Sequence, residues 1–170
     1  MRAFGWSVLL AAAFVSPCLA AQRAPKMSIA SFEQLARPLP LPYDEKAVAN
    51  KTVAAAMVRA KRNHKLLLID LGGNWCLDCR ILAGTVETQP LKNWMSEHFE
   101  IVAVDVGRFD RNMQIPAQFG VKGRLEGVPA VLIVDPKTKK LINSGRITAL
   151  ADARSMNPQA LADWFAGWAK

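Results

Sequence analysis

Two cysteines, Cys76 and Cys79, lie three positions apart and follow an apolar run at residues 66–71. A strand that leads into a helix would place both thiols on the first helical turn. There, free backbone N–H groups and the positive end of the helix dipole favour a thiolate. A thiolate, unlike a thiol, attacks disulfides. The spacing therefore predicts a pair that carries out dithiol–disulfide exchange.

Cysteine usage favours a chemical role for this pair over a structural one. The third cysteine of the chain, Cys18, falls in a predicted leader. A bridge between Cys76 and Cys79 would close a very short loop, so it would constrain the unfolded chain little. A zinc site needs further ligands, and the two histidines, His64 and His98, fall at predicted helix ends. We expect no metal and no cofactor beyond the redox-active disulfide; an inert structural bridge is the alternative.

Residues 1–20 have the three-part layout of a secretory signal peptide. Arg2 gives a positive start, residues 8–15 form an apolar run too short to span a bilayer, and small residues end at Ala20. We expect cleavage after Ala20 and a periplasmic or secreted product with no stable membrane span. A lipoprotein anchored through Cys18 is the less favoured alternative.

The chain is basic, with a formal net charge of +8, or +7 once Arg2 leaves with the leader. Such a net positive charge favours binding to acidic partner proteins or anionic surfaces, or it serves solubility alone. No dense cluster of basic residues is present, and Lys137, Lys139 and Lys140 fit a turn between strands. We therefore expect no nucleic-acid partner.

Hydrophobic patterns place the cysteine pair in an α/β fold. Alternating prolines at 38, 40 and 42 predict that residues 21–43 form an extended arm or linker, with packing on the domain as one alternative. The domain follows at 44–170. We expect helices at 44–63 with Asp44 as cap, at 76–98 with an interruption near Gln89-Pro90, and from Asn157-Pro158 onward, and strands at 66–71, 99–106, 130–134 and 140–144. Crossovers make the first two strands parallel, and a tight turn makes the last two antiparallel. The predicted architecture is a mixed central β-sheet flanked by helices, with an extra N-terminal helix.

Three features, in this order along the chain, resemble the thioredoxin-fold family over residues 45–170. They are Asp70 six residues before the first cysteine, the Trp-Cys-x-x-Cys-Arg block at 75–80, and Val128-Pro129 directly before a strand. Within that family, the Gly-Gly-Asn-Trp-Cys segment at 72–76 is similar to exported bacterial thioredoxin-like disulfide isomerases and related oxidoreductases.

The resemblance implies a division of labour around the two cysteines. Cys76 would face solvent as the nucleophile that forms the mixed disulfide, and the less exposed Cys79 would resolve it. Asp70 costs free energy to bury in an apolar strand, and it would take the Cys79 proton through a water. The alternation of side chains does not settle which face Asp70 points to, so an acid that merely reaches solvent is the alternative.

Trp75, Val128 and Pro129 are expected to form the client-binding rim. The resemblance implies a cis bond before Pro129 that presents the Val128 backbone to an extended client; a trans proline at the first position of a strand is the alternative. Trp75 would lie beside the cysteines and offer an apolar contact. The glycines at 72–73 and the loop at 107–127 depart from the common thioredoxin pattern, so this surface should differ.

Asp78, between the two thiols, is the candidate for redox tuning. A negative charge there would oppose a thiolate, raise the thiol pKa and favour a reductase or isomerase over a strong oxidant. A solvated charge with little effect is the alternative.

The sequence thus predicts an exported thiol–disulfide oxidoreductase. It would act as a reductase or isomerase on cysteine-containing exported proteins, with electrons from a thiol donor that the sequence does not identify. Three alternatives stay open: a net oxidase, a reductase dedicated to one pathway such as cytochrome maturation, and a non-catalytic binding or chaperone module on the same fold.

Overall fold

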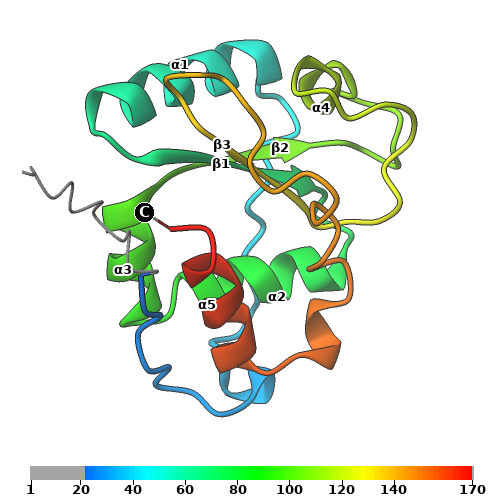
Figure 1. Cartoon of the computed structure of the whole chain (residues 1–170). Coiled ribbons are helices and arrows are strands. Elements are labelled where there is room, and N and C mark those ends of the chain that lie inside the picture. Colours follow the sequence, from blue (N-terminus) through cyan, green and yellow to red (C-terminus); the bar gives the residue numbers. More distant parts are fainter. Residues whose placement is uncertain (1–21, 170) are drawn as a thin grey trace, which may run out of the picture.

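A three-stranded sheet in the order β2-β1-β3 forms the centre of the computed structural model (Figure 1), which describes residues 22–169. The predicted leader at 1–20 lies outside the described residues. β1 (Leu66–Gly72) pairs in parallel with β2 (Phe99–Asp105) and antiparallel with β3 (Ala130–Val134). The helices are α1 (Ala49–Arg62), α2 (Leu77–Val86), α3 (Leu91–His98), α4 (Gln114–Gln118) and α5 (Pro158–Ala166), with short 3-10 helices η1 (Phe32–Gln34) and η2 (Ala153–Ser155).

Helices cover both faces of the sheet, which confirms the predicted α/β fold with a mixed sheet and an N-terminal helix. Helix α1 lies on one face, and α2, α3 and α5 lie on the other (Figure 1). Along β1, Leu67, Ile69 and Leu71 pack in the core on the α1 side, whereas Leu68 packs in the core on the α2 side. Because side chains alternate along a strand, Asp70 belongs to the α2 side. The structure thereby settles the face that the sequence left open.

Local hydrogen-bonding groups set the helix ends. Asn157 caps α5 by accepting an amide of its first turn at 2.8 Å, as the Asn-Pro pair predicts, and Pro90 separates α2 from α3 at the predicted interruption. The first long helix begins at Ala49, not directly after Asp44 as predicted. The Asp44 carboxylate instead accepts the amide of Lys46 at 2.9 Å and closes a local turn.

No helix within residues 22–169 is long and apolar enough to cross a membrane.

β2 is an edge strand of the sheet and is only partly buried. It pairs with β1 on one side, and Ile101 in its middle is 39% exposed. The neighbouring Glu100 carboxylate forms an ion pair with Arg59 of α1. A charged group on the edge strand discourages pairing with another chain.

The predicted fourth strand at 140–144 is reduced to an isolated bridge at Val134. The reason is the fully buried Asn143, whose side chain forms hydrogen bonds to β3 that the backbone of a partner strand would otherwise form. Its Oδ1 accepts the amide of Ile133 at 2.9 Å, and its Nδ2 donates to the carbonyl of Val131 at 2.7 Å. The Asn143 side chain therefore satisfies two backbone groups on this edge of β3 that a regular partner strand would otherwise pair.

The segment at 22–43 packs against the domain. Leu39 and Tyr43 are buried, at 4% and 2% exposure. Arg80 of α2 donates hydrogen bonds to the carbonyls of Leu39 at 2.9 Å and Pro40 at 3.2 Å. The end of this segment is therefore fixed to the helix that carries both cysteines.

Candidate active site

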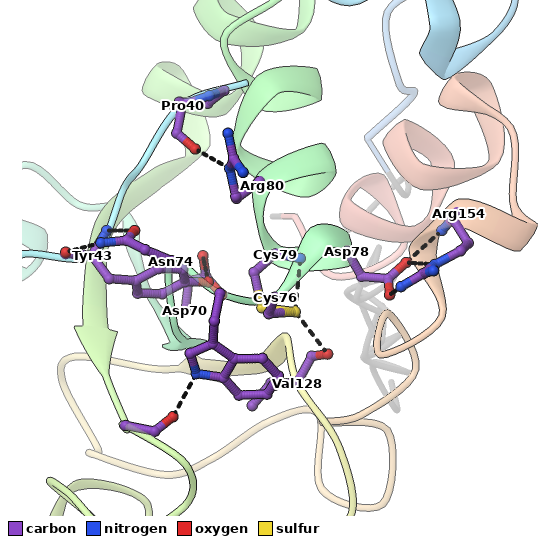
Figure 2. Close-up of a disulfide and its surroundings, with 12 residues drawn as sticks. Pro40, Tyr43, Asp70, Asn74, Cys76, Asp78, Cys79, Arg80, Val128 and Arg154 are labelled. Carbon is purple, nitrogen blue, oxygen red and sulfur yellow. Dashed lines mark hydrogen bonds and ion pairs between the residues drawn. A yellow bond between two sulfur atoms is a disulfide. The ribbon is translucent and has the colours of Figure 1, made fainter. Parts of the chain in front are cut away.

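Cys76 and Cys79 form a disulfide at the N-terminus of α2. Cys76 is the N-cap residue, with an extended backbone, and its Sγ accepts the amide N–H of Cys79 at 3.1 Å (Figure 2). The sulfur thus occupies the position where a helix offers unsatisfied N–H groups and the positive end of its dipole. Once the disulfide is reduced, this placement favours a thiolate at position 76.

The two sulfurs differ less in burial than predicted. Cys79 is fully buried, as expected, but Cys76 is only 5% exposed and does not face open solvent. The backbone before β3 covers it, since the Val128 carbonyl oxygen lies 3.4 Å from Cys76 Sγ (Figure 2). This backbone therefore limits access to Cys76 Sγ on one side.

Val128 and Pro129 lie where the resemblance places them. The peptide bond between them is cis, as it implies. Val128 is 7% exposed, so its carbonyl, rather than its side chain, is the group offered to a chain lying beside Cys76.

Trp75 forms an exposed wall beside the cysteines. Its side chain is 43% exposed, and the indole N–H donates to the carbonyl of Gly107 at 2.8 Å. The Arg108 guanidinium lies 4.2 Å from the indole ring centroid, and the Phe109 ring meets the indole edge-on. The long loop after β2 therefore fixes the orientation of Trp75 and contributes a positive charge to the rim.

Asp70 is buried on the same side of β1 as α2. Burial raises the pKa of its carboxyl to about 7, and a hydrogen bond from the Tyr43 hydroxyl opposes this rise. Asp70 Oδ2 accepts the Tyr43 hydroxyl at 2.9 Å, whereas Oδ1 is buried without a hydrogen-bond partner. Such a group changes protonation near neutral pH, which suits a proton acceptor.

Asp70 also lines a largely apolar pocket of about 490 Å³ between β1, β2, α2 and the segment at 40–42. The exposed Ile101 and Glu87 lie at its rim. The residues that line this pocket include no cation to neutralise the Asp70 carboxylate. Burial therefore dominates the pKa of Asp70.

Gly72 is required by close packing around the site. A Cβ at this position would lie 2.7 Å from Cys79 Sγ and closer still to the Tyr43 hydroxyl oxygen. A larger residue would displace one of them. The glycine that departs from the thioredoxin pattern thus makes room for Tyr43.

Asp78 is buried and paired with a cation, so it is not the solvated charge of the alternative interpretation. Arg154 of η2 donates to it from the backbone amide at 2.9 Å and from Nε at 3.0 Å, and Nη2 completes the ion pair (Figure 2). Burial raises the pKa of Asp78, but the hydrogen bonds and charge of Arg154 outweigh it and lower the pKa. The charge between the thiols is therefore compensated.

Three residues around the cysteines were missed by sequence reasoning. Tyr43, Asn74 and Arg154 bond to site residues or hold them in place. Arg154 is 76 positions from Asp78, and no local pattern links them. Tyr43 ends the segment predicted to be an arm or linker, and the available signal for it is a lone aromatic residue after alternating prolines.

The histidines do not join the site. His64 lies just beyond the C-terminus of α1, and His98 ends α3, where its ring stacks on Trp94. Within residues 22–169, no three His, Cys, Asp or Glu side chains gather as a metal site requires.

Replacing Arg154 with glutamine should slow the alkylation of the Cys76 thiol. The variant leaves the Asp78 carboxylate at the first turn of α2 without its cation, so the pKa of the Cys76 thiol should rise and alkylation by iodoacetamide at pH 7 should slow roughly threefold or more. The double variant Asp78→Asn/Arg154→Gln should recover the wild-type rate. Equal rates in wild type and Arg154→Gln would show that the ion pair does not influence the thiol.

Asp70 should make stability depend on pH in an identifiable way. Its pKa of about 7 in the folded protein exceeds the value of about 3.9 in an unfolded chain, so the folded state binds the proton more tightly between these values. Its contribution to the free energy of unfolding is present in full below pH about 4 and is lost as the pH rises through about 7. The stability lost across this range is about 4 kcal/mol. Urea unfolding of wild type and Asp70→Asn should show the wild type losing stability relative to the variant over this window. A difference that does not vary with pH would contradict this assignment.

A family model described as thioredoxin-like matches residues 48–136 of this chain. The crystal structure of disulphide isomerase from Xylella fastidiosa Temecula1 matches with 39% sequence identity and a TM-score of 0.68, and covers 75% of this chain and 96% of that one. A search of curated proteins found no match.

Two further solved structures are more distant. The C-terminal domain of Neisseria meningitidis DsbD, in its oxidised form, is 23% identical with a TM-score of 0.39, over 54% of this chain and 77% of that one. A Pseudomonas aeruginosa protein of unknown function is 16% identical with a TM-score of 0.38, over 73% and 86%. Both likenesses are too weak to argue from. On the family match and the Xylella structure, together with the Cys76–Cys79 site, the chain belongs to the thioredoxin-like family.

Proposed function

We propose that this protein is an exported thiol–disulfide oxidoreductase that acts as a reductase or isomerase on cysteines of other exported proteins. The observation that carries the proposal is the Cys76–Cys79 disulfide at the N-terminus of α2, where Cys76 Sγ accepts a backbone amide. A purely structural bridge would gain little from this placement, since it closes so short a loop.

The reaction begins with the reduced pair. The Cys76 thiolate attacks one sulfur of a client disulfide, and the other client sulfur leaves as a thiolate. Cys79 then gives its proton to Asp70 and attacks Cys76 Sγ, which breaks the bond between Cys76 and the client. The client sulfur leaves with the electron pair, so the client is reduced and the Cys76–Cys79 disulfide is restored.

The client lies along the backbone before β3 in this proposal. The Val128 carbonyl lies beside Cys76 Sγ and can accept a client N–H, as in strand addition. Trp75 offers an exposed apolar face on the rim. Arg108 over the indole ring adds positive charge there, in keeping with acidic residues near the client cysteine.

Asp78 does not support the reductive direction, because Arg154 compensates its charge. Support comes instead from the Xylella relative, which is named a disulphide isomerase. A reductase or isomerase in an oxidising compartment must be kept reduced, so a thiol electron donor completes the proposal. The leader pattern at 1–20 supports export to the periplasm or beyond the cell.

Replacing Cys79 with alanine should trap clients covalently. Cys76 would still attack a client disulfide, but the mixed disulfide could no longer be resolved. Non-reducing electrophoresis of the purified variant from the exporting host should show adducts that reductant releases. The matched control, Cys76→Ala, keeps one cysteine but should give no adducts.

Absence of adducts from Cys79→Ala, together with a wild-type disulfide that glutathione-range buffers do not reduce, would favour a non-catalytic binding module. For an active protein, rescue of a scrambled-disulfide substrate would identify an isomerase. Simple reduction without rescue would identify a reductase. Net oxidation of a reduced substrate would overturn the reductive direction.

A further inference from the structure

The Tyr43 hydroxyl lies close to both the buried carboxyl of Asp70 and the sulfur of Cys79. It donates to Asp70 Oδ2 at 2.9 Å. It also lies beside Cys79, because a Cβ at Gly72 would approach both the hydroxyl oxygen and Cys79 Sγ so closely that the two atoms are within about 5 Å of each other. One side chain therefore adjoins both the group that must lose a proton and the group suited to receive it.

The active-site loop holds Tyr43 by its backbone. Asn74 accepts the Tyr43 amide at 3.1 Å and donates to the Tyr43 carbonyl at 2.8 Å (Figure 2). Arg80 binds the carbonyls of Leu39 and Pro40, just before it. The segment that sequence analysis described as an arm is thus fixed at its end by two residues that flank the cysteines.

Burial and two nearby carboxylates keep the Tyr43 phenol neutral. Burial raises the pKa of Tyr43 first, and the charges of Asp70 on β1 and Asp105 at the end of β2 raise it further. Asp105 is itself paired with Arg111 at 2.8 Å, and α2 contributes the uncharged Cys79 side chain. The hydroxyl therefore stays a donor to Asp70 throughout the working pH range, and its oxygen stays free to accept.

We propose that the Tyr43 hydroxyl bridges proton transfer from Cys79 to Asp70 in the resolving step, in the place where the sequence-based mechanism required a water. The proposal rests on the proposed function. The Cys79 proton moves to Tyr43 Oη as the phenolic proton moves to Asp70 Oδ2, so Tyr43 ends neutral. The Cys79 thiolate attacks Cys76 Sγ, and the client sulfur leaves with the electron pair. Tyr43 is thus a positioning and relay residue, and Asp70 is the proton acceptor.

The test separates the two chemical steps with an aryl disulfide, 5,5′-dithiobis(2-nitrobenzoate). Attack by Cys76 on the reduced protein releases one coloured thiolate, and resolution by Cys79 releases the second. In Tyr43→Phe, the first release should keep its wild-type rate, whereas the second should slow about tenfold or more at pH 7. The second rate should approach the wild-type rate as the pH is raised well above 7, because a growing fraction of Cys79 then ionises without help.

Matched variants distinguish the relay from a packing role. Asp70→Asn should show the same pH-dependent loss, and the double variant should be no slower than either single variant, because both remove one pathway. Thr85→Val removes another buried hydroxyl of the α2 region, one that donates to Ile81 at 2.7 Å, and should leave the pH profile unchanged. A second release that is unaffected in Tyr43→Phe, or slowed equally at every pH, would overturn the relay. Absence of the first release in wild type would instead overturn the proposed function.

A second measurement needs no variant. Tyr43 is the sole tyrosine of the chain, so global incorporation of 3-fluorotyrosine labels this position alone. The fluorine resonance should titrate with Asp70 near pH 7 and should shift when the disulfide is reduced to thiols. A resonance that ignores both pH and reduction would contradict the bridge.

Discussion

A backbone amide that points at a sulfur atom underlies the whole site. The N–H of Cys79 donates to Cys76 Sγ because Cys76 occupies the N-cap of α2, one short turn after the buried strand β1. A helix offers its unsatisfied donors only at this end, so the strand-to-helix turn decides which cysteine is stabilised as a thiolate. The apolar strand and the helices on both faces of the sheet hold this turn in place.

Charge compensation around the cysteines is selective. Asp78 and Asp105, the two other buried acids within residues 22–169, are paired with Arg154 and Arg111. Asp70 has no cation and a single hydrogen bond, so burial governs its pKa. The protein thus pairs two buried acids with arginines and leaves a third, Asp70, able to exchange a proton near neutral pH. This asymmetry separates a working carboxyl from structural ones.

The fold and the redox pair could be predicted from sequence because both depend on local signals. The apolar run of β1, the cysteine spacing and the proline before β3 are short patterns with direct structural meaning. The ion pair of Asp78 with Arg154 could not be predicted, because the two residues are 76 positions apart and no local pattern singles out Arg154 among the arginines of the chain. The prediction of a fourth strand was wrong because the buried Asn143 side chain bonds to the backbone of β3 in place of regular strand pairing. An alternating hydrophobic pattern does not reveal such a side-chain contact.

The segment at 39–43 changes the view of which parts make the active site. Its prolines suggested a spacer, yet Arg80 and Asn74 attach it beside the cysteines. The most direct test of the account is the pKa of the Cys76 thiol in the reduced protein, measured from the pH dependence of thiolate absorbance with Cys79 replaced by serine. The account predicts a value below about 7.5, within the range of activated cysteines at helix N-termini. A value at or above about 8.5, that of an ordinary cysteine, would contradict it.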